Sequence, residues 1–339
     1  MKRLLLLVPS TTYRTTDFVR AATQLDVELV VGTEQSQSLE EISGGTQTFD
    51  FKNPVKGSEQ IEAFSRKFPL DAIVAVDDGA VMLAARSSEA LSLVHNKPEA
   101  VTATRNKHRL RQLLYQAGLL SPEFQLAKIC ENSQNVAANI TYPCVLKPVM
   151  LSASQGVIRA DNPRQFVAAF ARIATILQVS AAQMDSKPED ESVRQILIEN
   201  YVPGVEVALE GLLVRGKLNV LALFDKPDPL EGPYFEETIY VTPSRLSEVL
   251  QRKIVLAAQA AINTVGLEEG PVHAELRLHN EEPIVIEIAA RSIGGLCGRI
   301  LAFGAGIRLE ELILRHALSL PIDNMRREQR AGGVMMLPI

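Results

Sequence analysis

The stretch Val272–Gly295, VHAELRLHNEEPIVIEIAARSIGG, holds two apolar segments, VHAELRL and PIVIEIA, around the polar residues HNEE. Two short apolar segments joined by a polar turn predict an antiparallel β-hairpin. Because successive strand side chains face opposite sides, Glu287 is expected on the same face as Val285. Ile286 and Ile288 are then expected on the opposite face.

Glu275 and Glu287 occupy the two arms of this hairpin. A turn centred on residues 280–282 places them directly opposite each other, where side chains are close. Two carboxylates there repel unless a cation lies between them, and magnesium prefers oxygen ligands shared with substrate phosphates. The alternative is that one or both carboxylates are solvated on an exposed sheet face.

The second arm ends in Arg291, followed by Gly294 and Gly295. A guanidinium and glycine backbone amides beside a carboxylate indicate a site that takes a cation and an anion together. A surface ion pair followed by a turn explains the same residues equally well.

The composition is that of a globular protein: 339 residues, 46% hydrophobic, 22% charged, with a net charge of -5. This charge disfavours nucleic acid as a partner, because phosphate binding requires a basic face. The three cysteines form no CxxC pair, which is typical of reduced thiols in the cytosol. In the opening MKRLLLLVPS, the apolar run Leu4–Val8 is too short for the core of a signal peptide, and no small-residue cleavage site follows, so it predicts a buried strand. No run suits a membrane span. We therefore expect a soluble, cytoplasmic protein.

The first third of the chain alternates strands and helices. The segments RLLLLV, VELVVG and DAIVAVDDG predict strands, with a helix at residues 16–25, which indicates a parallel sheet covered by helices. The dinucleotide fingerprint GxGxxG is absent. Asp77 and Asp78 come at a strand's carboxyl end, where ligands gather, although Asp78 suits a helix N-cap equally well.

The middle of the chain changes from helices to short strands. Pro98 suits the start of a helix, Thr104 the start of a second one and Gly118 its end. The strands FQLAKI, PCVLKPV and GVIRA then precede a helix at residues 163–177 and an exposed loop at 183–192.

The last part begins with QILIENYV, VEVALEGLLV and KLNVLALFD, which predict an antiparallel meander. Helical spacing of apolar residues predicts a long helix between Pro243 and Gly266. The final GGVMMLPI reads as a strand that a longer natural chain continues or a partner completes, so the chain is expected to associate.

Two lysines occupy unusual positions. Lys147 lies inside an apolar strand, where lysine is costly without an anion, and Lys107 opens a helix, where its charge opposes the helix dipole. A bound phosphate would favour both positions, although either lysine alone can extend to solvent.

Two further segments complete the set of candidate positions. The loop Leu151–Val157, LSASQGV, offers hydroxyls and backbone amides that can surround phosphate oxygens, although many surface loops have this composition. In LIENYVPGVEVALEG, Glu199 precedes and Glu206 follows a break at Pro203-Gly204, which can present backbone groups to a base and a carboxylate to hydroxyls. Exposure on an edge strand is the alternative for both glutamates.

The order of these motifs resembles the ATP-grasp superfamily of carboxylate–amine and carboxylate–thiol ligases, and most of all its L-amino-acid ligase-like branch. The resemblance covers roughly residues 98–320. It implies an N-terminal parallel α/β domain at 1–97, followed by an ATP-grasp fold of two subdomains at 98–320, with a small lid subdomain at about 122–198. Residues 321–339 would begin a C-terminal segment.

The resemblance also implies a role for each matched position. Lys107 and Lys147 would bind the α- and β-phosphates of ATP. The loop would close over the phosphates, Glu199 and the backbone at 201–202 would hold adenine, and Glu206 the ribose. The implied ATP-binding residues are Lys107, Lys147, Ser152, Ser154, Gly156, Glu199, Tyr201, Val202 and Glu206.

Glu275 and Glu287 would ligate Mg²⁺, for which Mn²⁺ can substitute, and Arg291 would be the catalytic residue that stabilises the transferring phosphoryl group and the activated carboxylate. The family often has asparagine two residues after the second glutamate, whereas this chain has Ala289, which puts the number of magnesium ions in doubt. Substrate contacts are expected near the acidic segment that follows residue 225 and at the strand ends. The candidates are Lys226, Glu236, Glu237, His273, Gly294 and Gly295. For His273 the alternative is a packed or hydrogen-bonded residue that takes no part in binding.

The function that the resemblance implies is ATP-dependent ligation of a small carboxylate and an amine, both expected to be amino acids, through an acyl phosphate. A carboxylase or carbamoyl-phosphate-type enzyme is one alternative, although no biotin-attachment or glutaminase segment is visible. A catalytically impaired nucleotide-binding regulator is the other. No nucleic-acid or membrane partner is expected, and a homodimer is compatible with the sequence.

Overall fold

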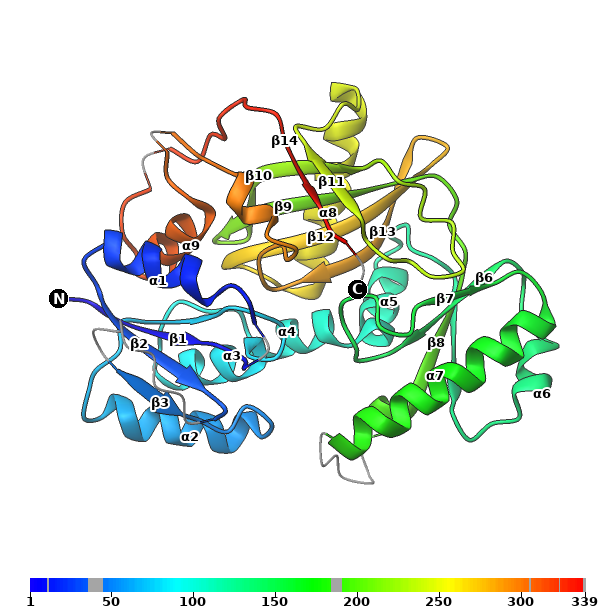
Figure 1. Ribbon diagram of the computed structural model, residues 1–339, viewed down its shortest axis with the longest axis horizontal. Helices are drawn as coiled ribbons and strands as arrows, with labels where there is room; N and C mark the ends of the chain where they lie inside the picture. Colours follow the sequence, from blue (N-terminus) through cyan, green and yellow to red (C-terminus); the bar gives the residue numbers. More distant parts are fainter. Residues whose placement is uncertain (11, 36–44, 184–190, 305, 323, 338–339) are drawn as a thin grey trace.

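The computed structural model describes residues 1–339 except 11, 36–44, 184–190, 305, 323 and 338–339. Its strands form three sheets that occupy separate parts of the molecule (Figure 1). We call them the N-terminal sheet, the small sheet and the large sheet. Among the described residues, no helix is long and apolar enough to cross a membrane.

The N-terminal sheet is parallel throughout, with the order β3-β2-β1-β4. Its strands are β1 (Arg3–Leu7), β2 (Glu28–Thr33), β3 (Thr46–Thr48) and β4 (Ala72–Ala75), and its helices are α1 (Thr15–Gln24), α2 (Pro54–Ser65) and α3 (Val81–Ala90). Residues 4–7 are fully buried, because β1 lies inside the sheet and helices cover both faces. The parallel α/β prediction is confirmed.

Two short helices, α4 (Pro98–Arg105) and α5 (Lys107–Gln116), connect this part to the rest of the chain. Pro98 begins α4, as expected. The prediction that Thr104 begins the second helix is wrong, because Asn106 is the N-cap of α5 and its side chain accepts a hydrogen bond from the Arg109 amide.

The small sheet is antiparallel, in the order β5-β8-β6-β7. Its strands are β5 (Phe124–Lys128), β6 (Cys144–Pro148), β7 (Ile158–Ala160) and β8 (Gln195–Asn200), accompanied by α6 (Ser133–Ala137), α7 (Pro163–Gln183) and the 3-10 helix η1 (Glu191–Arg194). Phe166, Phe170 and Ile173 of α7 pack into the core of this sheet. Most of the predicted exposed loop, residues 184–190, lies outside the described residues.

The large sheet has the order β13-β12-β9-β10-β11-β14 and is antiparallel. Its strands are β9 (Val205–Val214), β10 (Lys217–Lys226), β11 (Ile239–Thr242), β12 (Gly270–His279), β13 (Glu282–Ala289) and β14 (Gly332–Met335). The predicted meander is partly wrong: β9 pairs with β10, but β8 belongs to the small sheet. The reason is that β12 takes the other edge of β9, and the chain turns at Gly204 (φ +110°), where a side chain would collide with the Leu278 carbonyl.

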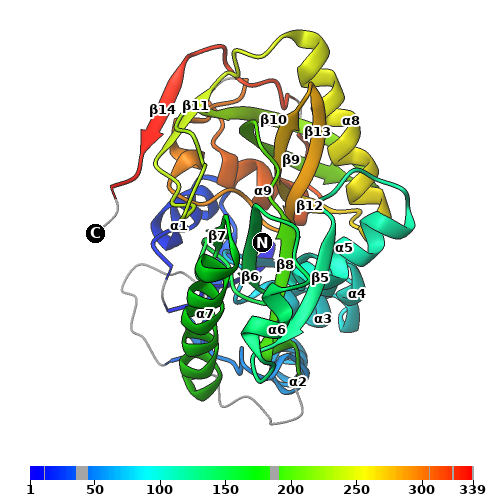
Figure 2. The same ribbon diagram turned by 90° about the vertical axis from the view of Figure 1, so that its right-hand side faces the viewer.

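The long helix α8 (Glu248–Val265) packs on the large sheet (Figure 2). Its predicted buried face and its end at Gly266 (φ +82°) are confirmed. The predicted start at Pro243 is wrong, because Ser247 is the N-cap and accepts from the Leu250 amide. The 3-10 helix η2 (Cys297–Ile300) and α9 (Leu309–Ala317) complete the fold, and β14 lies at the edge of the large sheet beside β11 (Figure 2).

The hairpin of β12 and β13 has the predicted register at one point and a β-bulge beside it. Glu275 pairs with Glu287, but Leu276 pairs with Val285, so one residue of β13 is extra. The expected alternation is therefore wrong: Val285 and Ile288 share one core, whereas Ile286 and Glu287 both line a cavity.

Candidate functional site

A cavity that opens to solvent lies between the small sheet and the large sheet, and its empty space, open solvent included, is about 700 Å³. Its lining includes residues that are far apart in the sequence and had been singled out as candidates. These are Lys107, Lys147, Ser152, Ser154, Glu199, Tyr201, Val202, Glu206, Glu237, Glu275 and Glu287. The other candidates, Gly156, Lys226, His273, Arg291, Gly294 and Gly295, are not in its lining, and Glu236 is exposed.

Glu199 on β8 is a buried anion shared by two cations. Its Oε2 lies 2.6 Å from the Lys147 Nζ, and its Oε1 accepts from the Arg111 Nε at 2.6 Å. Burial opposes ionisation, but Arg111 and Lys147 outweigh it and hold the pKa of Glu199 below its usual value. Exposure on an edge strand is therefore excluded for Glu199, and Lys147 does not extend to solvent.

Lys107 lies where α5 begins and reaches the glycine-containing loop. Its Nζ donates to the Leu151 carbonyl at 2.5 Å and lies 3.9 Å from the Glu287 Oε1. In that loop Ser154 has a positive φ of 53°, and Gly156 follows at 71°, next to the Pro148 ring. The loop thus bends tightly over the cavity, and Gly156 shapes it without facing the cavity.

Lys226, at the end of β10, lies among three carboxylates. Its Nζ is 2.7 Å from Glu206, 2.8 Å from Glu237 and 2.9 Å from Glu275, in each case to Oε1. Burial lowers the pKa of this lysine, but the three carboxylates outweigh it and raise the pKa well above the usual value. Conversely, burial and the neighbouring Glu275 raise the pKa of Glu237, although Lys226 opposes them. Lys226 is the one cation that contacts all three acids, while Arg277 lies 3.7 Å from Glu206 and His273 lies 3.5 Å from Glu275.

The donor set suits a divalent hard cation. Oxygen atoms of Glu206, Glu237 and Glu275 lie within 4.8 Å of one another, and Glu287 faces Glu275 across the hairpin. Magnesium prefers such all-oxygen sites. At position 289, Ala289 is buried and adds no ligand atom, so the departure noted in the sequence remains in the structure.

Tyr201 follows β8 and lines the cavity between two arginines. The Arg159 guanidinium lies 4.1 Å from the centre of its ring, and that of Arg277 lies at 5.2 Å. Arg277 also donates to the carbonyls of Gly204 and Leu230 and lies 3.7 Å from the Glu206 Oε2. The Arg277 guanidinium therefore holds the chain around the β8–β9 turn in place through these contacts. The Glu206 side chain is buried.

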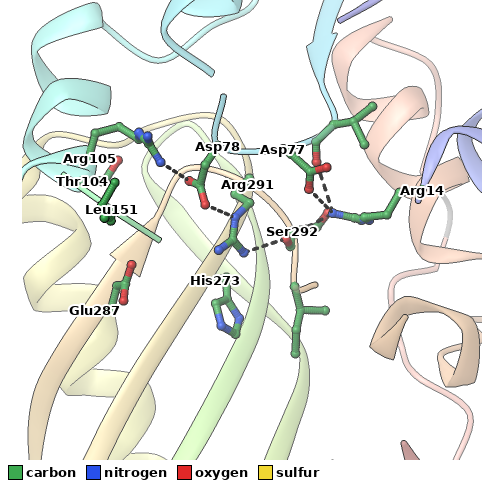
Figure 3. A network of polar contacts seen from close by, with 12 residues as sticks. Arg14, Asp77, Asp78, Thr104, Arg105, Leu151, His273, Glu287, Arg291 and Ser292 are labelled. Carbon is green, nitrogen blue, oxygen red and sulfur yellow. Dashed lines mark hydrogen bonds and ion pairs between the residues drawn. The ribbon is translucent and has the colours of Figure 1, made fainter. Parts of the chain in front are cut away.

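Arg291, directly after β13, is bound to the N-terminal part of the chain (Figure 3). Its Nε donates to the Asp78 Oδ2 at 2.8 Å, and its Nη1 to the Ser292 carbonyl at 3.0 Å. Arg105 lies on the other side of Asp78, 3.3 Å from Oδ1. Burial alone would raise the pKa of the Asp78 carboxyl, but Arg291 and Arg105 outweigh burial and lower that pKa to about 2. The N-cap alternative for Asp78 is wrong, since Ala80 is the N-cap of α3.

Further hydrogen bonds join the loop after Arg291 to Tyr13 and Arg14, which follow β1. Arg14, which is buried, donates to the Ser292 Oγ at 2.6 Å and to the Val76 carbonyl at 3.2 Å (Figure 3). The Gly295 amide donates to the Tyr13 hydroxyl at 2.5 Å. The backbone around Gly294 and Gly295 is therefore fixed by the N-terminal part.

His273 lies between two glutamates on the face of the large sheet. Its Nε2 is 3.5 Å from the Glu275 Oε1, and its Nδ1 is 3.7 Å from the Glu210 Oε2. Burial lowers its pKa, but the two carboxylates outweigh burial and raise the pKa of His273 to about 9. Glu210, fully buried, also accepts from the Ile293 amide at 2.9 Å.

The sequence reading missed Arg111, Arg105, Arg14 and Glu210. For Arg111 a signal was present: it stands one residue after Leu110 and three before Leu114, on the buried face of α5, where an arginine requires an anion. The partners of the other three come from distant parts of the chain, and no local pattern indicates them.

Residues 140–300 match the family model described as an ATP-grasp domain. Alanine–anticapsin ligase of Bacillus subtilis strain 168 is 28% identical over 245 residues, which are 70% of this chain and 51% of that protein. Dapdiamide A synthase of Enterobacter agglomerans is 29% identical over 233 residues, 67% of this chain and 52% of that protein. The chain thus spans about half the length of the curated relatives it matches.

Among solved structures, the L-amino acid ligase from Bacillus licheniformis superposes with a TM-score of 0.80 at 24% identity, covering 100% of this chain and 80% of that one. This likeness establishes the fold. The match to the ATP-grasp domain thus covers residues 140–300, and the chain as a whole is similar to ligases of the L-amino-acid ligase-like branch.

Proposed function

We propose that the protein is an ATP-dependent carboxylate–amine ligase, which forms an amide or peptide bond through an acyl phosphate and releases ADP and phosphate. The observation that carries the proposal is the lining of one cavity. Lys107, Lys147, Glu275 and Glu287 come from four separate segments and meet there. Lysines for phosphates and carboxylates for a metal are what phosphoryl transfer requires.

In this proposal the nucleotide lies between the two sheets. Lys107 and Lys147 neutralise the α- and β-phosphates, and the loop with Ser152 and Ser154 covers the phosphates. The backbone at Tyr201 and Val202 holds the adenine with Glu199 behind it, and Glu206 binds the ribose. Gly156 contributes by allowing the loop its positive φ.

Glu275 and Glu287 would hold Mg²⁺, or Mn²⁺ in its place. The bound cation would supply neutralisation of the charge on the terminal phosphates. Lys226 is the neighbouring cation, and its contacts with Glu206, Glu237 and Glu275 place its positive charge beside the proposed metal ligand Glu275. Lys226, Glu237 and His273 are therefore proposed as substrate-side residues.

The proposed chemistry has two steps. A carboxylate oxygen of the acid attacks the γ-phosphorus, the bond to the β–γ bridging oxygen breaks, and ADP leaves. The amine nitrogen then attacks the carbonyl carbon of the acyl phosphate, phosphate departs with the C–O bond electrons, and the nitrogen loses a proton. In this proposal Arg291 stabilises the negative charge in the first step, and the backbone at Gly294 and Gly295 would receive the acyl group.

We propose amino acids as both substrates, because alanine–anticapsin ligase and the L-amino acid ligase are named for amino acids. We also propose domain boundaries at residues 97 and 320 and a lid subdomain at 122–198 around the small sheet. A cytoplasmic location and a homodimer are further proposals.

The test is a screen of amino acids in pairs, scored by released phosphate, with the products identified by chromatography. ADP, phosphate and a dipeptide are expected, and hydroxylamine in place of the amine should give a hydroxamate together with ADP. AMP and pyrophosphate as main products would reject the acyl-phosphate route. ATP binding without turnover for every pair would favour the regulator.

A further inference from the structure

Arg291 is proposed above as the residue that touches the reacting groups, yet it stands on a loop. Residues 290–296 form no helix or strand, and an arginine side chain loses considerable rotamer freedom when it is fixed. A guanidinium that must meet a transferring phosphoryl group therefore requires a partner that holds it in one orientation.

Asp78 is that partner, and it lies 213 residues earlier in the chain. The bond from the Arg291 Nε to the Asp78 Oδ2 measures 2.8 Å, and both side chains are only 16% exposed. The Arg291 Nη1 donates to the Ser292 carbonyl. The described part of the chain shows no protein hydrogen bond to the Arg291 Nη2, and in the proposal this nitrogen is the one that would meet the ligand.

Asp78 is the strongest of the carboxylates that raise the pKa of Arg291 against the effect of burial. Glu287 and Glu210 also act on the charge of Arg291, and in Figure 3 Glu287 lies on the same side of Asp78 as the guanidinium. Asp78 is the carboxylate that the Arg291 guanidinium contacts directly, at 2.8 Å, and so it fixes the direction in which this side chain points.

Arg105, the last residue of α4, keeps Asp78 in place. It lies 3.3 Å from the Asp78 Oδ1, opposite Arg291, so the carboxylate is held from both sides (Figure 3). The charge of Asp78 is thus maintained even though the group is largely buried.

We propose that Asp78 is a positioning residue for Arg291, so that the N-terminal α/β part of the chain, with Arg105, sets the orientation of the guanidinium that acts on substrate. The proposal rests on the proposed function for what Arg291 does, but the arrangement itself can be tested without turnover. A misplacement of about 1 Å at such a group can lower a rate about a hundredfold.

The first experiment follows the Nε–H signal of Arg291 by ¹⁵N NMR of arginine side chains, assigned by its loss in Arg291→Lys. In the wild-type chain its exchange with water should be slow, and in Asp78→Asn at least about tenfold faster. The matched control is Asp17→Asn. Asp17 accepts a hydrogen bond from the Arg299 Nε at the same distance of 2.8 Å, and this pair also joins the N-terminal part to the rest of the chain. The difference is that the Arg299 side chain is half-exposed. Unchanged exchange in Asp78→Asn would overturn the proposal.

The second experiment measures affinity for MgADP with and without aluminium fluoride, a mimic of the transferring phosphoryl group. Asp78→Asn should weaken the fluoride complex about tenfold or more and MgADP alone by less than about twofold. Asp78→Glu should recover part of the loss, and in an Arg291→Met background Asp78→Asn should cause no further loss. Equal weakening of both complexes would mean a general structural role and reject the proposal.

The two proposals fail in different ways. If no acid supports ADP release by the wild-type chain, the proposed ligase is wrong, while the NMR comparison still decides whether Asp78 holds Arg291. If ADP is released but Asp78→Asn keeps the wild-type kcat, KM and exchange rate, the ligase stands and the positioning role is wrong.

Discussion

The ammonium group of Lys226 lies 2.9 Å from the carboxylate of Glu275, the residue proposed to bind magnesium. Glu206 and Glu237 complete the cluster at 2.7 Å and 2.8 Å. In the described structure a lysine thus provides the positive charge that the acids require, which connects folding stability with metal binding.

Lys226→Met should destabilise the fold, because three largely buried carboxylates lose their cation. Removing one partner of a buried pair costs about 3–5 kcal/mol, whereas an exposed pair contributes at most about 1 kcal/mol. Thermal unfolding should show a large loss that millimolar Mg²⁺ partly restores. Lys253→Met is the control, since Lys253 pairs with the exposed Glu282. If Lys226→Met lowered the unfolding temperature no more than Lys253→Met does, the cluster around Lys226 would not stabilise the fold.

Lys147→Met should leave a folded protein that binds ATP at least about tenfold more weakly, a difference of about 1.4 kcal/mol. Folding should persist, because Arg111 remains paired with Glu199 at 2.6 Å. Calorimetry measures the affinity, with Lys217→Met, an exposed lysine on β10, as the control. Unchanged affinity would reject the phosphate role of Lys147.

Glu287→Gln should lower turnover much more than it weakens ATP binding. The substitution removes a charge that the proposed metal site requires, and charge on the γ-phosphate develops in the transition state. The comparison is kcat with the dissociation constant for ATP, using Glu282→Gln on the exposed start of β13 as the control. Equal losses in both quantities would assign Glu287 to ground-state binding only.

Only Cys130 should react readily with Ellman's reagent in the native protein at pH 8. Cys130 is exposed, whereas burial raises the pKa of Cys144 to about 12 and that of Cys297 to about 12, and the thiolate is the reactive form. We expect one reactive thiol per native chain and none in Cys130→Ser, with all three cysteines reacting after denaturation. Rapid labelling of Cys144 or Cys297 would contradict the packing described here.

Asp78 should contribute to stability in a defined acid range. Its pKa is about 2 in the folded chain against 3.8 as the reference value. Since the folded pKa is depressed, the contribution is complete above about pH 4 and is lost as the pH falls toward 2, with a maximum of about 2 kcal/mol. The difference in unfolding free energy between the wild-type chain and Asp78→Asn should therefore shrink below pH 4. If this difference in unfolding free energy stayed constant from pH 6 to pH 3, the depressed pKa of Asp78 would not be its cause.

Local sequence patterns predicted the elements that depend on neighbouring residues. Periodicity and turn chemistry were enough to predict the first strand and the buried face of α8 with its end at Gly266. They also predicted the pairing of Glu275 with Glu287. Helix starts at Thr104 and Pro243 were wrong, because the side chains of Asn106 and Ser247 supply the caps and proline does not.

The partners of the charged residues were not predictable. The order of motifs indicated which lysines and glutamates matter, but not that Lys226 joins three acids or that Glu199 lies between Lys147 and Arg111. A buried charge requires some counter-charge, but its sequence neighbours do not specify which one.

The sequence alone determined the strands, the helix-covered parallel sheet and the succession of candidate ligands, because these depend on residues within a few positions of one another. Only the tertiary structure decided the bulge that turns Ile286 and Glu287 to the same cavity, and the bond between Arg291 and Asp78. A bulge depends on how two strands pair, and an ion pair across 213 residues depends on how separate sheets pack. Neither leaves a periodic trace in the chain, since the free energy that selects them arises only when distant surfaces exclude water together.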